Sequence, residues 1–434
     1  MKLKCASICL QLILTGNTKL LNFDSFPYTK QLLNSKSGFG QGVVTLGGVA
    51  MTRLLHITFS LTTYFVLVSG SLAASLIPIG HLGSFSGSSF GYDVSDNGGV
   101  VVGRSNGEAF RWATTGGIEA LGFLPGRSFG GSQANGVSGD GKVVVGYSPS
   151  TNSGTTNTEA FRWTSGDGMV GLGFLPGGDF DSEASAASAD GSVIVGYSSS
   201  ADGNLREAFR WTSGGGMVGL GDFPGGAFNS DATGVSANGN VVVGVGRRAS
   251  FVREAFRWTP ASGLVGLGDL PGGDVLSVAW GVSANGNVVV GNSSSAKSGY
   301  GPEAFRWTAG GGMVGLGDLP GGSFSSSARG VSGDGSVVVG YGDTAAGSEA
   351  FVWTQADGMR RLIDVLVANG ATGLDGWTLT EAQAVSADGQ WVVGSGKPPG
   401  SYTYEPILAF IAPGAPPRPS VNIVPSNSLL LLQN

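Results

Sequence analysis

Residues 303–340 read EAFRWTAGGGMVGLGDLPGGSFSSSARGVSGDGSVVVG, and three motifs within this stretch recur along the chain. Glu-Ala-Phe begins it, Gly-Leu-Gly-Asp-Leu-Pro-Gly-Gly lies in its middle, and Val-Ser-x-Asp/Asn-Gly-x-Val-Val-Val-Gly ends it. Repetition every 46 to 51 residues indicates a repeat architecture. The first motif begins at Glu108, Glu159, Glu207, Glu254, Glu303 and Glu349, and the last begins at Val94, Val137, Ala187, Val235, Val282, Val331 and Val385.

Each repeat predicts four short β-strands. The Gly-Val-Ser stretch is the first, and a tight turn such as Asp140-Gly141 joins it to Val-Val-Val-Gly, whose unbroken apolar run predicts burial on both faces. Glu-Ala-Phe-Arg-Trp-Thr is the third strand and Met-Val-Gly-Leu-Gly the fourth. Four strands repeated seven times predict an all-β fold, a seven-bladed β-propeller of four-stranded blades.

The two ends of the repeat region complement each other. The seventh copy has its Val385–Gly394 motif and an Ala409–Ile411 strand, but no Gly-Leu-Gly strand follows. Ile79–Gly83 matches the missing strand. We therefore expect residues 76–83 to complete the last blade, which would cover two exposed sheet edges. An open solenoid is the structural alternative, and it would leave this split unexplained.

Composition agrees with such a fold. Gly makes up 78 of the 434 residues, which argues against long helices because Gly costs about 1 kcal/mol per helical position relative to Ala. Residues 75–434 carry 18 basic and 29 acidic side chains, so they offer no electrostatic surface for nucleic acid. Both cysteines, Cys5 and Cys9, lie before this region, and no disulfide is therefore predicted within it.

The first 74 residues differ from the rest. Arg53, the uncharged run of residues 54–74 and the small residues Ser71 and Ala73 follow the plan of a secretory signal peptide. Met51 stands where that signal would start, so we interpret residues 1–50 as a mis-annotated extension and residues 51–74 as the signal. The alternative is an uncleaved membrane anchor. Either reading exports residues 75–412, and we expect an extracellular or cell-surface location.

The motifs resemble those of the HAF-repeat family of extracellular bacterial proteins. The resemblance covers roughly residues 76–412, and it implies export and a repeat scaffold with no catalytic residues to carry over. Two departures stand out: Glu replaces the His of the family name, and Leu362–Ala371, expected to be a short helix, replaces the fourth strand of the sixth unit. The Pro-rich tail, residues 413–434, is either disordered or a truncated signal similar to a PEP-CTERM sorting motif.

The sequence gives little support for catalysis or metal binding. His81 is the only histidine of the exported part, and its position in a predicted strand favours a packing role over that of a base. The turn position reads Asn in three copies and Asp in four, so a carboxylate is not required there and turn formation is favoured over calcium binding. We predict no catalytic residue, no metal site and no cofactor.

The repeated charges are predicted to be structural. Glu108, Arg111 and their equivalents lie three residues apart on a strand and point to opposite faces of the sheet. An enzyme needs one active site and not six. We therefore expect Glu108, Glu159, Glu207, Glu254, Glu303 and Glu349 to lie between blades, bonded to a neighbouring strand or arginine.

Binding is predicted where the repeats vary. The connections between the second and third strands differ in length from 4 to 12 residues, and they emerge on the same face as the connections between blades. That face would carry one apolar residue per blade, which either packs between blades or contacts a ligand. These residues are Phe85, Phe129, Phe180, Phe228, Val275, Phe324 and Trp377.

The sequence thus favours an exported, non-catalytic interaction module that binds a surface glycan or protein, functions as a monomer, and meets a membrane only if residues 54–74 stay uncleaved. The alternative is a glycan-active hydrolase or lyase that uses unrepeated carboxylates, since glycosidases need two carboxyl groups. Paired unrepeated carboxylates in a central pocket would favour the enzyme. A channel filled by repeated apolar residues would favour the module.

Overall fold

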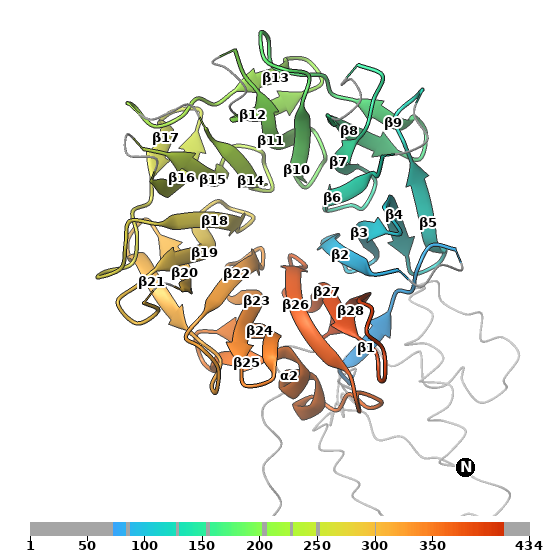
Figure 1. Cartoon of the computed structure of the whole chain (residues 1–434), viewed down its shortest axis with the longest axis vertical. Helices are drawn as coiled ribbons and strands as arrows, with labels where there is room; N and C mark the ends of the chain where they lie inside the picture. Colours follow the sequence, from blue (N-terminus) through green and yellow to red (C-terminus); the bar gives the residue numbers. More distant parts are fainter. Residues whose placement is uncertain are drawn as a thin grey trace, which may run out of the picture. The chain divides into compact units, whose positions relative to one another are not determined.

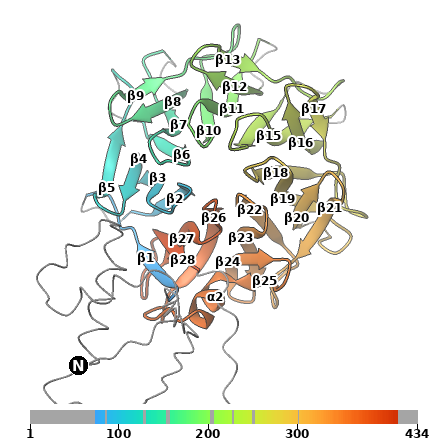
Figure 2. The same ribbon diagram turned by 180° about the vertical axis from the view of Figure 1, so that it is seen from behind.

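The structure is a computed structural model, described here for residues 73–83, 87–126, 130–152, 157–201, 206–225, 229–248, 252–299 and 301–411. Over these ranges the chain forms seven four-stranded antiparallel sheets, arranged in a ring as the blades of a β-propeller (Figure 1). The predicted all-β, seven-bladed fold is confirmed. The same ring seen from behind shows the inner strands around its centre (Figure 2).

In the first six blades the strands follow chain order from the centre outward. Blades one to three are β2(Ser89–Val94), β3(Val100–Ser105), β4(Glu108–Ala113), β5(Gly117–Gly122); β6(Gln133–Val137), β7(Val144–Ser148), β8(Glu159–Thr164), β9(Gly168–Gly171); and β10(Ser182–Ala187), β11(Val193–Ser199), β12(Arg206–Thr212), β13(Gly216–Gly219). Blades four to six are β14(Asp231–Val235), β15(Val242–Arg247), β16(Arg253–Thr259), β17(Gly263–Gly266); β18(Ser277–Val282), β19(Val288–Ser294), β20(Pro302–Thr308), β21(Gly312–Gly317); and β22(Ser326–Val331), β23(Val337–Thr344), β24(Gly347–Thr354), β25(Gly358–Arg361). Blade seven is β26(Thr378–Val385), β27(Trp391–Lys397), β28(Glu405–Phe410) and β1(Ser75–Pro78).

The core consists of apolar layers between neighbouring blades. In the layer between blades one and two, Ala109 of the first blade meets Phe161 of the second, and both side chains are fully buried. Val144 and Val145 of the second strand are buried too, one in this layer and one in the next, as the apolar run predicts. The alternation of β-strand side chains therefore lets each blade serve two layers.

Each inner hairpin is closed by the same turn. In blade two Ser138 Oγ donates to Asp140 Oδ1 at 2.7 Å, and that oxygen also accepts the Lys142 N–H at 3.0 Å. Gly141 follows with φ of +73°. In blade four Asn238 Oδ1 accepts the equivalent pair of hydrogen bonds, which explains why Asp and Asn exchange at this position.

A buried serine joins each of five blades to the blade before it. Ser182 Oγ of blade three accepts the Ala160 N–H at 3.0 Å and donates to Gly173 O at 2.8 Å, both in blade two. Because the serine is fully buried, it satisfies backbone groups that would otherwise lack partners. The equivalent serines are Ser132, Ser230, Ser277 and Ser326.

The sixth blade corrects one prediction. Its fourth strand is present as β25, and the helix α2(Leu362–Ala368) follows the strand instead of replacing it. Leu362 and Leu366 are fully buried against Val352, which stands where the other repeats have Arg. Arginine would place a charge beneath this helix. None of the helices in the described ranges has the length and apolar character needed to span a membrane.

The seventh blade corrects the predicted bounds of its fourth strand. β1 pairs antiparallel with β28 in the register Ser75↔Phe410 to Pro78↔Ile407, so the strand begins before the predicted residues 76–83 and ends earlier. Ile79–Gly83 is not a strand, because Gly80 and Gly83 have φ of +84° and +66° and turn the chain away. His81 therefore lies outside a strand, with its Nδ1 2.8 Å from Ser89 Oγ.

Candidate functional site

The connections between strands define two faces of the ring. The turn face carries the tight hairpins, such as residues 138–143 and 165–167 in blade two. The loop face carries the longer connections, such as residues 398–404 within blade seven and 172–181 between blades two and three. Each inner strand starts at the loop face and ends at the turn face.

The predicted apolar ring of the loop face is only partly described. Phe85, Phe129 and Phe228 lie outside the described residues. Phe180 is 61% exposed and meets the ring of Phe174 edge to face, with centroids 5.4 Å apart.

The other predicted members differ in exposure. Val275 is 51% exposed, and Phe324 is half-buried. Trp377 packs against the core layer between blades six and seven, and its backbone N–H donates to Leu374 O at 3.1 Å. Phe180 and Val275 are thus available to a ligand, whereas Trp377 serves packing.

The repeated glutamates lie close to their own blades' outer strands. Glu159 is 4% exposed, and its Oε1 accepts the N–H of Gly173, in the connection to blade three. The same bond joins Glu207 to Gly221, Glu254 to Gly268 and Glu303 to Gly317, at 3.0 to 3.2 Å.

The two remaining glutamates differ from these four. Glu349 is buried and lies 3.5 Å from Arg361 Nη1 of its own blade. Glu108 is half-buried.

The repeated arginines reach the next blade instead of pairing with these glutamates. Arg210 Nε of blade three donates to the turn carbonyl of Gly239 in blade four at 3.2 Å. Arg257 and Arg306 make the equivalent bonds to Gly286 and Gly335. The sequence predicts inter-blade contacts for the glutamates. Their hydrogen bonds instead lie at the outer end of their own blades, and the arginines reach the next blade, because the two side chains point to opposite faces of the strand.

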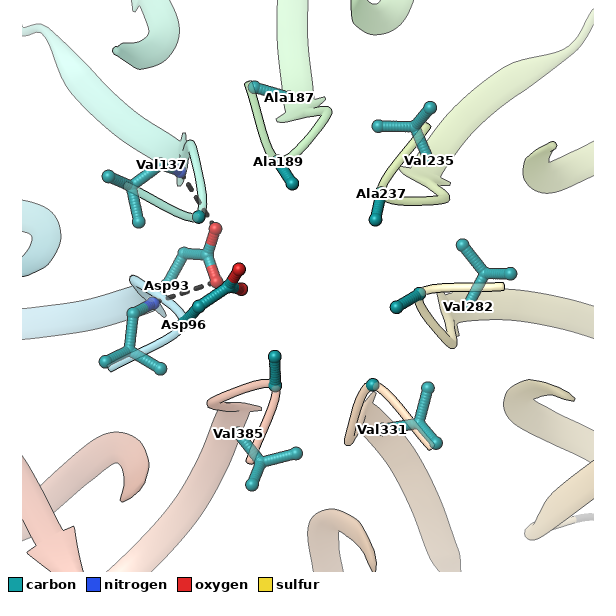
Figure 3. A pocket seen from close by; sticks show the side chains of 15 residues that line it. Asp93, Asp96, Val137, Ala187, Ala189, Val235, Ala237, Val282, Val331 and Val385 are labelled. Carbon is teal, nitrogen blue, oxygen red and sulfur yellow. Dashed lines mark hydrogen bonds between the residues drawn. The ribbon is translucent and has the colours of Figure 1, made fainter. Parts of the chain in front are cut away.

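A cavity of about 160 Å³ lies at the centre of the turn face (Figure 3). The last residue of each inner strand lines it, and so does the turn residue two positions later. A chain of backbone bonds follows this rim, for example from Ala189 N to Ala237 O and from Ala237 N to Ala284 O, both at 3.1 Å. The apolar ring is Val94, Val137, Ala187, Val235, Val282, Val331 and Val385.

Two unrepeated carboxylates enter this cavity from blade one. Asp93 stands where the other blades have Gly or Ala, and its carboxylate joins two blades: Oδ1 accepts the Val94 N–H at 2.8 Å and Oδ2 accepts the Val137 N–H at 2.9 Å (Figure 3). Burial raises the pKa of Asp93 to about 7, although both backbone hydrogen bonds lower it. The Asp93 side chain therefore links blades one and two through two hydrogen bonds to the backbone.

Asp96 lies two residues after Val94, at a position that is Gly or Ala in every other copy of the motif. Burial raises its pKa first, and the negative charges of Asp388 and Asp140 add to that effect. The sequence prediction missed Asp93 and Asp96, although each departs from a position that is Gly or Ala in the other copies. Listing such departures would have found them.

The cavity combines features of both function classes. Two carboxyl groups with raised pKa are typical of acid–base sites. However, about 160 Å³ is close to a cavity that holds one benzene molecule, and both oxygens of Asp93 already accept backbone N–H groups. The space is small for two linked sugar rings, and repeated Val and Ala residues form most of its wall.

Comparison with known proteins gives no family. No family model matches the chain, and no curated protein is similar to it. The chain is similar to the crystal structure of TolB from Acinetobacter baumannii, with 18% identity, 51% of this chain and 52% of that chain covered, and a TM-score of 0.38. It is also similar to a putative TolB from Agrobacterium tumefaciens, with 16% identity, 64% and 89% covered, and a TM-score of 0.40. The match spans about half the length of the first of these proteins.

Proposed function

We propose that this chain is an exported, non-catalytic repeat scaffold that binds glycan or protein through its loop face at the cell surface or in the extracellular matrix. One observation carries the proposal. Polar side chains that repeat from blade to blade bond within the scaffold, as Glu159, Ser182 and Arg210 do. Side chains that differ between blades gather on the inner strands and the loop face.

The inner strands show this variation most clearly. Each has a β-bulge two residues before its last residue, and the residue at the bulge has a different identity in each blade. Some of these side chains contact one another across blades: the Arg329 guanidinium lies 4.1 Å from the centre of the Trp280 ring. The bulge residues are Tyr92, Asn135, Ser185, Thr233, Trp280, Arg329 and Gln383. A regular frame with varied side chains on its inner strands is typical of a binding scaffold.

Export rests on the sequence of residues 51–74 and on the cysteine-free repeat region that follows. The partner is a surface glycan or protein, and the protein acts as a monomer without nucleic acid. A membrane is involved only if residues 54–74 remain attached.

The test is a binding screen with secreted protein expressed from the full chain. Purified glycans, isolated cell walls and cell-surface proteins are presented on an array, and the carbohydrate products are analysed for new reducing ends. Saturable binding without new reducing ends supports the proposal. The absence of binding to every class of ligand would contradict it.

A glycan-active enzyme is the second candidate, because Asp93 and Asp96 place two carboxyl groups of raised pKa in one pocket. New reducing ends that disappear in both Asp93→Asn and Asp96→Asn, at unchanged melting temperature, would favour it over the module.

A further inference from the structure

Aromatic side chains gather on the loop face where the last blade meets the first. Phe90 of β2 lies between two tyrosines: its ring centre is 5.5 Å from that of Tyr404, which precedes β28, and 6.5 Å from that of Tyr92. All three are half-buried. The positions equivalent to Phe90 in the other blades are Gln, Glu, Asp, Val, Ser and Glu, so this cluster occurs only at the junction of blades seven and one.

The loop beside the cluster displays a further tyrosine. Tyr402 is 95% exposed, between β27 and β28. The neighbouring backbone is held in place: Ser401 N donates to Pro398 O at 3.0 Å, and Thr403 N donates to Ser401 Oγ at 3.1 Å. A tyrosine presented by an ordered loop loses little conformational freedom on binding, and its ring offers both an apolar face and a hydroxyl group.

Two cations flank these rings. Lys397 Nζ lies 4.8 Å from the centre of the Tyr404 ring, and Arg104, the cross-strand partner of Phe90, is exposed. Among the described residues neither cation forms an ion pair with a carboxylate. Blade seven carries two acidic residues near the cluster. Gln383 Nε2 donates to Glu381 at 2.7 Å, and Glu405 follows Tyr404 at the start of β28. Both cations therefore lie beside aromatic rings in a region that carries 18 basic and 29 acidic residues.

We infer that this junction, formed by Phe90, Tyr402, Tyr404, Arg104 and Lys397, binds an acidic polysaccharide whose sugar rings carry carboxylates. The tyrosine rings stack on the apolar faces of the sugars. The guanidinium and ammonium groups pair with the carboxylates. This inference rests on the proposed function and names its ligand class. The net negative charge of the protein repels a polyanion elsewhere, so binding is local and weakens with salt.

The probe is polygalacturonate, with neutral dextran as its uncharged counterpart, bound to the full-chain protein in its secreted form. We expect Tyr402→Ala and Lys397→Gln each to weaken polygalacturonate binding about tenfold. The melting temperature should not change in Tyr402→Ala, since Tyr402 is 95% exposed, and should change little in Lys397→Gln, since Lys397 is half-buried and loses only its contact with the Tyr404 ring. Val314→Ala, an exposed apolar residue of blade five, and Lys297→Gln, an exposed lysine of the loop between β19 and β20, are the controls, and they should bind as the wild type does.

Three outcomes separate the claims. Weaker binding in the two junction variants alone supports the inference. Equal polygalacturonate binding in junction variants and controls, or a preference for dextran, overturns the inference and leaves the binding module intact. The absence of binding to polygalacturonate, together with an empty screen of other glycans and proteins, overturns both.

Discussion

At the junction of blades two and three, the Ala160 N–H donates to Ser182 Oγ at 3.0 Å, and that hydroxyl donates to Gly173 O. At the junction of blades seven and one, Pro406 takes the place of Ala160 and has no N–H to donate. Ser89, the equivalent of Ser182, donates instead to Ser105 Oγ at 2.7 Å. One serine position therefore serves two different networks.

The backbone bonds around these serines are the same at both junctions. Ser182 N donates to Thr158 O at 3.0 Å, and Ser89 N donates to Tyr404 O at 2.9 Å. Ile79 N donates to Pro406 O, as Leu172 N does to Ala160 O. The backbone frame is thus preserved where the side-chain network changes, and the changed junction is the one that carries the unrepeated aromatic and cationic side chains.

Removing β1 is expected to have the largest effect on the junction of blades seven and one. Deleting residues 75–79 takes Ile77 and Ile79 from the core layer between blades seven and one and leaves β28 with an open edge. We expect the free energy of unfolding to fall by roughly 5 kcal/mol or more. Thermal melting and sedimentation check this: a monomer that melts at the wild-type temperature would show that β1 does not close the ring.

The repeated glutamates of the third strands come next. Glu254→Ala removes the acceptor of the Gly268 N–H and the partner of Arg248, so stability should fall by about 2 kcal/mol. Glu207→Ala should lose a similar amount, because its carboxylate bonds Gly221 in the same way. Chemical denaturation of both variants checks the equivalence. Loss of a catalytic activity in one variant at full stability, with the other silent, would contradict a structural role.

Replacing each of the two serines compares the two junctions directly. Ser182→Ala leaves the Ala160 N–H and the Gly173 carbonyl without their partner, and it should cost about 1–3 kcal/mol. Ser89→Ala should cost less, because Pro406 presents no N–H there and the partners of the Ser89 hydroxyl are the side chains of Ser105 and of the half-buried His81. The difference between the two free energies of unfolding is the measurement, and equal losses would refute the account of the proline junction.

The last prediction concerns the dependence of stability on pH. The folded-state pKa of Asp93, about 7, lies above its unfolded value of 3.8, so the protonated carboxyl favours the fold. This contribution is complete below pH 4 and is lost as pH rises through 7. Wild-type melting temperature should therefore fall relative to Asp93→Asn between pH 5 and 8. A constant difference between the two proteins would contradict the raised pKa.

Much of the fold could be predicted because it depends on local patterns. The turn at Asp140-Gly141 and the apolar run at Val143–Val145 determine hairpins and burial within a few residues of chain. The serine network had a signal as well, since Ser89, Ser132 and Ser182 each lie five residues before the Val-Ser or Ala-Ser motif. Position-by-position comparison of the repeats would have found it.

The aromatic junction could not be predicted in this way. Phe90 and Tyr404 lie at opposite ends of the chain, and they meet only when the last blade comes to lie beside the first. Neither residue follows a repeat, so no pattern marks it. The fourth strand of blade seven was misplaced for a related reason: Ile79–Gly83 resembles the Gly-Leu-Gly segment, but that segment turns away from the sheet at Gly80.

The division between a repeated scaffold and an unrepeated binding junction is tested most directly by measuring melting temperature and polygalacturonate affinity on two variants side by side. We expect Glu254→Ala to melt at a lower temperature and to bind normally at a temperature where it is folded. Tyr402→Ala should melt as the wild type does and bind about tenfold more weakly. The opposite pattern, with normal binding in Tyr402→Ala and lost binding in a folded Glu254→Ala, would contradict the account.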